Sequence, residues 1–413
     1  MKRIIALLCA AVMAYSCSTV PTARLTFENT TDVDRVEEMV EVELATLKSS
    51  MGVMSDETFV VYSASGKEIP SQITYDGKLI FQVSVAPMSK STYKIKVGTP
   101  AEYESKVYGR QFPERLDDFA WENDRIAYRV YGPASQVLDQ KLYGYDVWTK
   151  SVTRMVLEER YKMDLDPVWR AKIAEVAKTD QAKADEMLRS VSFHVDHGTG
   201  MDAYNVGPTL GAGTLALMES GKILYPYCYK DYEILEMGPL RLTVKLTYNP
   251  LKVADRDDVV ETRTLVVDAG TQFVKTKVSY SNIRKSTKVV AGIVMAGAKG
   301  KQAKVSKKEG FAAYADVDRL EEQGTIFVGT IFSAPARSAG IMPFVKDDPT
   351  YAGTGMTGHV SLIGEYIPNS EFVYYWGAAW NQYNVPTFED WVTLVGNTAK
   401  AVKSPFVITI EQN

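Results

Sequence analysis

The chain has 413 residues and a mass of 45.9 kDa, which is long enough for two or three domains. Its 47 Lys and Arg against 51 Asp and Glu give a formal net charge of −4, which disfavours a nucleic-acid partner, because nucleic acids are bound by basic surfaces. Hydrophobic residues make up 46% and charged residues 24%, a globular composition that excludes a disordered or fibrous protein.

The first 16 residues are expected to be a secretory signal peptide. Lys2 and Arg3 precede an apolar run over residues 4–14, which is shorter than the roughly 20 residues of a transmembrane helix. Residues 14–17 (Ala-Tyr-Ser-Cys) are similar to a bacterial lipobox, in which cleavage before the cysteine is followed by its lipidation. The sequence therefore predicts a lipoprotein anchored through Cys17 to a bacterial membrane, facing the periplasm or the cell surface. Ordinary secretion with Cys17 unmodified is the alternative.

Cysteine usage fits this interpretation. Cys9 leaves with the signal peptide and Cys17 carries the lipid, so Cys228 is the cysteine that remains and an intramolecular disulfide is excluded. Because Cys228 lies between Tyr227 and Tyr229, its thiol is expected to be packed in the core rather than to act as a nucleophile.

Residues 23–100 are expected to form a small immunoglobulin-like β-sandwich. Alternating apolar residues on both sides of Asp76 and Gly77 predict a β-hairpin around a type I′ turn. Strand-like runs at 36–47, 58–62 and 93–97 supply further strands of such a sandwich. The polar residues 101–106 are expected to form a linker.

Residues 107–413 are expected to form one large antiparallel supersandwich, because strand-like runs and turn residues recur along the whole segment. A helical insertion is predicted over about 166–190, where Asp166 can cap a helix and Pro167 can occupy its first turn. A second helix is predicted over 388–403, because Thr387 and Asp390 have the spacing of a capping box.

The glycine-rich residues 193–208 contain two of the three histidines of the chain. Polar residues on such a loop, carried by a rigid sheet, are typical of functional sites. We expect His197, oriented by Asp196, to transfer protons near neutral pH, with Tyr204 as a second acid or base and His194 as a further catalytic candidate. The alternative is a glycine-rich turn whose histidines hold its own backbone together.

Metal and nucleotide sites are weaker alternatives for this loop and the residues around it. The residues that could supply zinc-type ligands are His194, Asp196, His197 and His359. No second ligand pair has comparable spacing, and calcium at Asp196 and Asp202 has no better support. The glycines of residues 207–213 lack the Lys-Ser/Thr that follows in a phosphate-binding loop. We therefore expect neither a metal nor another cofactor, and no nucleotide.

Aromatic residues make up 11% of the chain, with 24 Tyr and 6 Trp, and several stand among polar residues. This mixture is typical of sugar-binding surfaces, where a ring stacks on the sugar and polar neighbours bond its hydroxyls; the alternative is an ordinary core. Arg129 and Lys150 are the cations expected to bind a substrate carboxylate. The residues predicted to bind substrate are Trp121, Glu122, Arg129, Asp146, Trp148, Lys150, Asp202, Trp376 and Trp380.

Several long motifs resemble those of an uncharacterised family of secreted proteins and lipoproteins from polysaccharide-utilisation gene clusters, a family labelled as a domain of unknown function. The segments that carry the resemblance are residues 113–124, 131–133, 146–150, 196–213 and 375–380. The resemblance implies a fold similar to the galactose-mutarotase-like supersandwich, with a site at 146–150 and 197–213. The genes of this family often lie beside those of pectin lyases and unsaturated-uronide hydrolases, which implies a glycan partner.

Two functions remain open at this point. The first is an enzyme that acts on uronic-acid-containing, pectin-type oligosaccharides by lyase or hydrolase chemistry; elimination would need a cation beside the base to neutralise the substrate carboxylate. The second is a non-catalytic glycan-binding lipoprotein that uses the same aromatic residues and loop. An aldose-epimerase-like enzyme is a third option. All three predict an oligosaccharide or polysaccharide partner and contact with the membrane through the lipid anchor alone.

Overall fold

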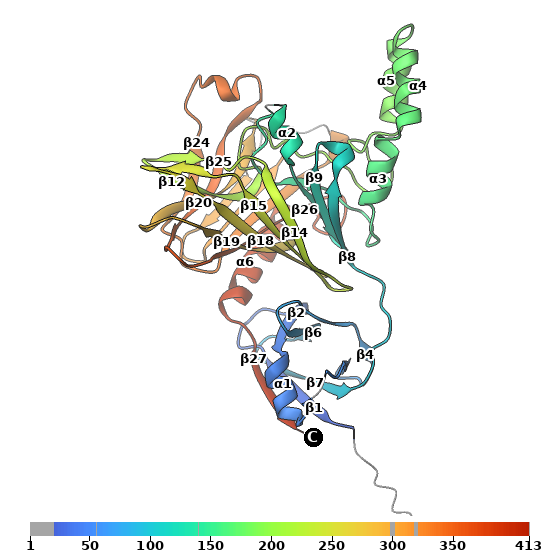
Figure 1. Cartoon of the computed structure of the whole chain (residues 1–413), viewed down its shortest axis with the longest axis vertical. Coiled ribbons are helices and arrows are strands. Elements are labelled where there is room, and N and C mark those ends of the chain that lie inside the picture. Colours follow the sequence, from blue (N-terminus) through green and yellow to red (C-terminus); the bar gives the residue numbers. More distant parts are fainter. Residues whose placement is uncertain (1–19, 55, 139, 298–301, 318–320, 413) are drawn as a thin grey trace, which may run out of the picture.

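The computed structural model describes residues 20–54, 56–138, 140–297, 302–317 and 321–412. The predicted signal peptide and Cys17 lie outside the described residues. Figure 1 shows a large β domain above a small sandwich, with two helices that project from the large domain. Within the described ranges, no helix has the length and apolar character needed to cross a membrane.

The small sandwich is built from two antiparallel sheets that enclose one hydrophobic core. The first sheet has the order β27 (Val407–Gln412), β1 (Thr22–Glu28), β7 (Lys90–Val97), β3 (Phe59–Tyr62) and β4 (Glu68–Ile69). The second has the order β2 (Arg35–Glu43), β6 (Lys78–Val85) and β5 (Ser71–Ile73), and α1 (Leu44–Met51) follows β2. Phe27 lies at the centre of the core, with its ring edge-on to those of Phe81 and Tyr93 at 5.7 Å in both cases.

The predicted hairpin around Asp76 and Gly77 is confirmed, but its turn type is wrong. Ile73 pairs with Leu79, and the Thr74 amide donates to the Lys78 carbonyl at 2.8 Å, which leaves a three-residue loop. In this fully described turn only Gly77 has a positive φ, of 78°. A type I′ turn needs two such residues, whereas a three-residue loop needs one.

The last strand of the chain belongs to the small sandwich and not to the large domain, in which the sequence analysis placed it. Strand β27 pairs antiparallel with β1, from Ala23 opposite Gln412 to Glu28 opposite Val407. An edge strand leaves a row of unpaired backbone groups, and β27 satisfies those of β1. The ring of Phe406, just before β27, packs edge-on against Phe27 at 6.1 Å. The sandwich is therefore closed by both ends of the described chain.

The large domain confirms the prediction of a mainly β fold with antiparallel sheets. Its strand ladders are all antiparallel in the described ranges, and an eight-stranded sheet packs against a five-stranded one. A four-stranded sheet of early strands packs beside them (Figure 1). The orders are β14-β15-β18-β19-β26-β23-β22-β21, β13-β12-β20-β25-β24 and β11-β10-β9-β8, and a small hairpin joins β16 to β17.

The bounds of these strands are as follows. The early sheet contains β8 (Val107–Phe112), β9 (Asp118–Asn123), β10 (Ala127–Val130) and β11 (Asp146–Trp148). The five-stranded sheet contains β12 (Ala212–Glu219), β13 (Lys222–Leu224), β20 (Thr287–Ala296), β24 (Ser338–Pro343) and β25 (Met356–Tyr366). The remaining strands are β14 (Tyr229–Met237), β15 (Arg241–Tyr248), β16 (Leu251–Val253), β17 (Arg256–Val259), β18 (Glu261–Asp268), β19 (Phe273–Tyr280), β21 (Gln302–Ser306), β22 (Phe311–Asp316), β23 (Ile326–Phe332) and β26 (Phe372–Trp380).

Helices lie where the sequence predicted them, and three more were missed. One of these is α1, so residues 44–47 at the end of the strand-like run 36–47 are helical and not part of a strand. The Asp166 carboxylate accepts from the Trp169 amide at 2.8 Å at the start of α4, and the Thr387 hydroxyl accepts from the Asp390 amide at 3.1 Å at the start of α6. The unpredicted α3 precedes α4, and α4 and α5 form the projecting hairpin of Figure 1. The helices are α2 (Pro133–Val137), α3 (Leu157–Asp164), α4 (Pro167–Ala177), α5 (Gln181–Arg189) and α6 (Phe388–Lys403).

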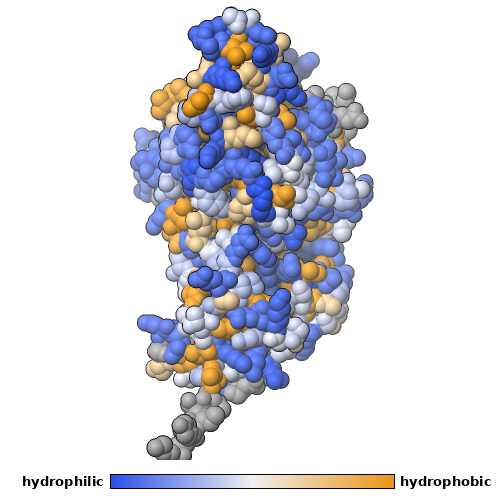
Figure 2. Space-filling view, turned by 90° about the vertical axis from the view of Figure 1, so that its right-hand side faces the viewer, coloured by the Kyte–Doolittle hydropathy of each residue, from blue (hydrophilic) through white to orange (hydrophobic). Residues whose placement is uncertain are grey.

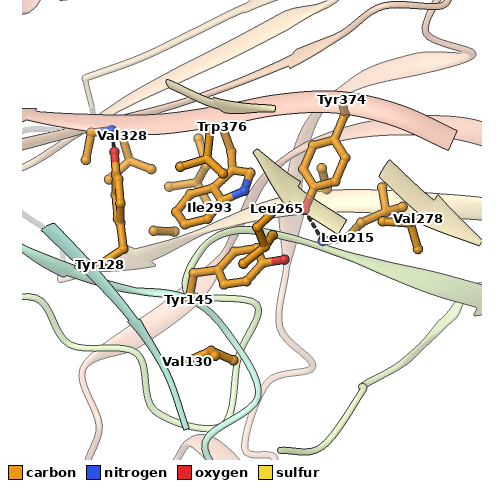
Figure 3. Packing of buried hydrophobic residues seen from close by; sticks show 14 of the residues in the cluster. Tyr128, Val130, Tyr145, Leu215, Leu265, Val278, Ile293, Val328, Tyr374 and Trp376 are labelled. Carbon is orange, nitrogen blue, oxygen red and sulfur yellow. Dashed lines mark hydrogen bonds between the residues drawn. The ribbon is translucent and has the colours of Figure 1, made fainter. Parts of the chain in front are cut away.

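A cluster of aromatic rings fixes the early sheet against the large one (Figure 3). The rings of Tyr145 and Trp376 stack at 4.0 Å with only 2° between their planes, and Tyr128 lies edge-on to Trp376 at 4.7 Å. The Tyr128 hydroxyl donates to the Gln272 carbonyl at 2.7 Å and accepts from the Ala378 amide at 2.8 Å. A buried ring whose hydroxyl is bonded on both sides holds its strand in place, so Tyr128 fixes β10 against the large sheet.

Candidate functional site

Three carboxylates surround one guanidinium in the early sheet. Arg129 of β10 stands opposite Asp146 of β11, and its Nε donates to Oδ2 of Asp146 at 3.0 Å. Its Nη2 donates to Oδ2 of Asp202 at 2.9 Å, and its Nη1 lies 3.4 Å from Oδ2 of Asp118. All four residues are buried, Arg129 with 4% of its surface exposed. We call Asp118, Arg129, Asp146 and Asp202 the Arg129 cluster.

Backbone pairing brings Asp202 to this cluster. Asp202 forms an isolated bridge with Trp148, and its amide donates to the Phe193 carbonyl at 2.8 Å. The loop lies so close to β11 that a Cβ on Gly200 would come within 2.2 Å of the Thr149 carbonyl oxygen. Glycine at this position, with a φ of 99°, therefore allows the loop to pack directly against the backbone that follows β11.

The cluster has an excess of negative charge if every group is ionised, because three carboxylates face one cation. Burial raises the pKa of Asp118 to about 6, against the pull of Arg129. Burial, together with the charge of Asp202, likewise raises the pKa of Asp146 to about 6. Carboxyl groups that exchange protons near neutral pH are typical of acid–base sites.

His194 lies at the solvent side of the Arg129 cluster. Its Nδ1 is 2.9 Å from the backbone oxygen of Asp202 and 3.6 Å from Oδ2 of the same residue, and 60% of its side chain is exposed. The exposed imidazole is thus held against a buried carboxylate. An imidazole beside a carboxylate is the arrangement that the sequence predicted, but for a different pair of residues.

The predicted pairing of His197 with Asp196 is wrong. Oδ1 of Asp196 accepts from the amides of Gly198 and Gly200, both at 2.8 Å, so this carboxylate closes the turn. Nε2 of His197 lies 3.1 Å from the Ser192 carbonyl oxygen instead. Tyr204 is buried, and its hydroxyl donates to the Gly211 carbonyl at 3.2 Å. These three residues hold the loop backbone, which was the alternative reading of the segment.

The predicted cations are already paired, so neither is available to a substrate carboxylate. Nζ of Lys150 donates to Oε2 of Glu122 at 2.6 Å and to the Asn123 carbonyl at 2.7 Å, and both charged side chains are fully buried. The second oxygen of Glu122 accepts from the amides of Val156 and Leu157 at the start of α3. Because Arg129 is occupied by three carboxylates, the prediction of a carboxylate clamp is wrong for both residues.

The predicted sugar-stacking rings lie in the core, where a sugar has no access to them. Trp121, Trp148 and Trp376 are fully buried and Trp380 is 2% exposed. Trp148 packs between Tyr161 at 5.0 Å and Phe193 at 4.6 Å, and its Nε1 donates to Oδ2 of Asp146 at 3.3 Å. The core alternative therefore holds for these four tryptophans, and Trp148 contributes to the Arg129 cluster only through its bond to Asp146.

The ligands of the zinc alternative are not assembled. His359 is buried in β25, where its Nε2 accepts from the Leu210 amide at 3.1 Å, and burial lowers its pKa to about 3. Among the side chains that the structure describes, no three His, Cys, Asp or Glu are grouped to hold a metal ion. Burial raises the pKa of the Cys228 thiol to about 12, which fits a packed cysteine rather than a nucleophile.

A cavity of about 380 Å³ lies between the small sandwich and the large domain, and no motif in the sequence predicts it. It is lined by β2, by the turn between β18 and β19, and by α6. In its wall, Arg241 donates to Glu41 at 2.7 Å and to Asp268 at 2.6 Å. Although burial opposes it, the charges of Lys275 and Arg241 lower the pKa of Glu41 to about 2. We call this cavity the interdomain cleft.

One face of the molecule is mostly hydrophilic. On the face shown in Figure 2, hydrophilic residues predominate, and the hydrophobic ones occur in small scattered groups. Scattered apolar residues of this kind are normal on soluble proteins and need no partner.

Comparisons with known proteins find a family, one related sequence and two solved structures of partial similarity. "Uncharacterized protein P7" of Formosa agariphila is 25% identical over 434 aligned positions, which cover both chains completely. A solved structure of a protein in the glycosyl hydrolase family 38 from Enterococcus faecalis has a TM-score of 0.47 and 11% identity over 94% of this chain and 47% of that one. An alpha-mannosidase from Enterococcus faecalis V583 has a TM-score of 0.43 and 9% identity over 94% and 46%.

The chain therefore spans about half the length of these two solved proteins. The sequence relationship is more extensive. The model of the domain of unknown function DUF4861 matches residues 27–408, which include both the small sandwich and the large domain. Because this match covers most of the sequence, the chain belongs to the DUF4861 family.

Proposed function

We propose that the protein is a carbohydrate-active enzyme that transfers protons through His194, with Asp202 as the residue that positions it. One observation carries the proposal: the exposed imidazole of His194 lies against the buried carboxylate of Asp202. Asp202 shares Arg129 with Asp118 and Asp146, whose pKa values are raised to about 6. Sites that place titratable groups of this kind together are typical of general acid–base catalysis.

The hydrogen bond of His194 assigns its tautomer. A backbone carbonyl oxygen can only accept, so Nδ1 carries the proton that it donates to Asp202, and Nε2 keeps its lone pair as a base. When Nε2 takes a proton from the substrate or from water, the ring becomes cationic. The Asp202 carboxylate, 3.6 Å from Nδ1, stabilises that charge. General acid–base catalysis of this type contributes about 10²–10⁴-fold to a rate.

The finer part of the proposal is a uronic-acid-containing oligosaccharide as substrate, cleaved by elimination or hydrolysis. Its support is the resemblance to secreted proteins of polysaccharide-utilisation gene clusters. Elimination needs a cation beside the base. Because Arg129 and Lys150 are buried in ion pairs, the proposal assigns this role to Arg154, which is 52% exposed and whose ion pair with the exposed Glu159 lies at the surface. The neighbouring Ser151 bonds the carbonyl groups of Gly198 and Thr199, which ties this segment to the histidine loop.

The same proposal includes secretion and a lipid anchor at Cys17, facing the periplasm or the cell surface. No metal or other cofactor is required for it. Mass spectrometry of the N-terminal peptide from cells tests the anchor, because a diacylglycerol on Cys17 is expected in the natural chain and is lost in Cys17→Ala.

A substrate screen tests the enzyme proposal. The mature protein is incubated with uronate and neutral oligosaccharides, and turnover is followed by absorbance of unsaturated uronides and by mass spectrometry. We expect turnover of at least one uronate oligosaccharide, with His194→Ala slower by about 10²–10⁴-fold. Binding without turnover would contradict the enzyme and favour a glycan-binding lipoprotein. A change of anomer ratio alone, seen by NMR, would favour an aldose epimerase.

A further inference from the structure

We propose that the interdomain cleft is a separate binding site for a neutral oligosaccharide. Its volume of about 380 Å³ falls within the roughly 300–1,000 Å³ of small-molecule sites, which occur preferentially between domains. The proposal does not depend on the chemistry at His194, because the cleft is built from β2, β19, β26 and α6 and shares no residue with the Arg129 cluster.

The charge of the cleft excludes an anionic ligand. Five acidic side chains line it against three basic ones, which are Arg35, Arg241 and Lys275. Arg35 is bonded by Glu38, and Arg241 by Glu41 and Asp268, so neither guanidinium is free for a ligand carboxylate. A ligand with hydroxyl groups and no charge meets no such repulsion, because hydroxyls both donate and accept.

Polar groups without a protein partner line the same cleft. Within the described residues, no protein group bonds the side-chain amides of Gln272 and Asn397 or the hydroxyl of Tyr375; the bond from Tyr128 goes to the backbone oxygen of Gln272. Burial and the nearby acidic side chains raise the pKa of Tyr375 to about 12, so its hydroxyl stays a donor at neutral pH. Two amides and a half-buried ring are the groups that bond the hydroxyls and cover the C–H face of a sugar.

The cleft is held in shape before any ligand enters. Nε2 of Gln82 donates to the Glu37 carbonyl at 3.0 Å on one side and to the Ala269 carbonyl at 3.2 Å on the other. Strand β2 has an irregular register between Arg35 and Glu38, and Glu37 has a left-handed φ of 49°. Fixed walls lower the entropy that binding costs, which favours a small polar ligand in this position.

The test uses the mature full-length protein and isothermal titration calorimetry. The probes are neutral gluco-, manno-, galacto- and xylo-oligosaccharides of one to four units, with a galacturonate trimer as the anionic comparison. The variant Gln272→Ala/Asn397→Ala removes both free amides from the cleft. Asn249→Ala is the matched control, because its amide bonds Gln136 at the surface and neither residue lines the cleft.

We expect at least one neutral oligosaccharide to bind, and the double variant to weaken this binding at least about tenfold, the equivalent of about 1.4 kcal/mol. Asn249→Ala and His194→Ala should leave the affinity unchanged, which separates the cleft from the proposed catalytic site. Three results would overturn the inference: no binding of any neutral probe, binding of the galacturonate trimer alone, or binding that the double variant does not weaken.

Discussion

The Arg129 cluster and the interdomain cleft both contain arginines paired with carboxylates, yet their acidic groups titrate in opposite directions. In the cluster, three buried carboxylates share one guanidinium, and the pKa values of Asp118 and Asp146 rise to about 6. At the cleft, Glu41 receives three cations, Lys78, Arg241 and Lys275, and its pKa falls to about 2.

Burial raises the pKa of the carboxyls in both places, and the number of nearby cations decides whether that rise is overcome. A carboxyl short of cations holds a proton near neutral pH and is suited to proton transfer. A carboxylate with several cations stays ionised and acts as a structural tie between domains. Replacing the charged groups one at a time tests this distinction.

Replacement of Arg129 should have the largest effect. In Arg129→Met three carboxylates lose their only guanidinium, and removal of one partner from a buried charge group costs about 3–5 kcal/mol. We expect this loss in the free energy of unfolding, measured by urea at pH 7, with a smaller loss at pH 5, where the carboxyls take up protons. Arg129→Lys should lie between the variant and the natural chain.

Arg337→Met is the matched control for that experiment, because Arg337 is an exposed arginine paired with Glu365. Its effect should stay within about 0.5 kcal/mol. A loss of under 1 kcal/mol in Arg129→Met would contradict the description of the cluster as charges that depend on one cation.

Replacement of Glu41 should weaken the contact between the domains. A pKa lowered from 4.5 to about 2 means that Glu41 stabilises the fold fully above pH 4.5 and loses this contribution as the pH falls toward 2. Glu41→Gln should therefore cost about 2–3 kcal/mol at pH 7 and much less at pH 3, by urea unfolding. Glu43→Gln is the control, because Glu43 is an exposed residue of the same strand. Equal losses of stability in the two variants would contradict the role of Glu41 in joining the two domains.

Replacement of Asp118 should stabilise the fold, whereas the two replacements above destabilise it. Its pKa is higher in the folded chain than its ordinary 3.8, so its charge opposes folding above pH 6 and ceases to do so as the pH falls below 3.8. Asp118→Asn should raise the free energy of unfolding at pH 8 by about 1–2 kcal/mol and leave it unchanged at pH 3.5. Destabilisation at pH 8 would show that Arg129 needs all three carboxylates.

The smallest expected effect concerns α6, which lines the cleft but not the cluster. Thr387→Ala removes the hydroxyl that accepts from the Asp390 amide, and loss of such a cap costs about 1 kcal/mol. Hydrogen exchange should quicken in the first turn of α6 and stay unchanged in β10. Faster exchange in β10 as well would mean that the two regions are coupled.

Much of the fold could be predicted because its signals are local. The hairpin at Gly77, the caps at Asp166 and Thr387, and the alternation of apolar residues along the strands each depend on a few neighbouring positions. The pairing of β27 with β1 could not be read in this way, because it joins residues from opposite ends of the described chain.

The site was only partly predictable for a related reason. Polar residues beside a tryptophan, such as Glu122 next to Trp121, indicate a solvent-exposed binding surface as long as the ion-pair partners of the polar residues are unknown. Here the partners of Arg129 lie 11, 17 and 73 residues away in the sequence, and together they make a buried ionic group. The sequence placed both histidines on one loop, and the structure has a loop there. Which histidine meets a carboxylate depends on how Asp202 pairs with Trp148.

The most direct test of the account compares the two loop histidines. His194→Gln and His197→Gln are assayed for kcat/KM on the best substrate of the uronate screen, with binding of that substrate and the free energy of unfolding measured for each. We predict a loss of about 10²–10⁴-fold in His194→Gln alone, with both folds intact. An equal rate in the two variants, or a loss confined to His197→Gln, would contradict proton transfer at the Arg129 cluster.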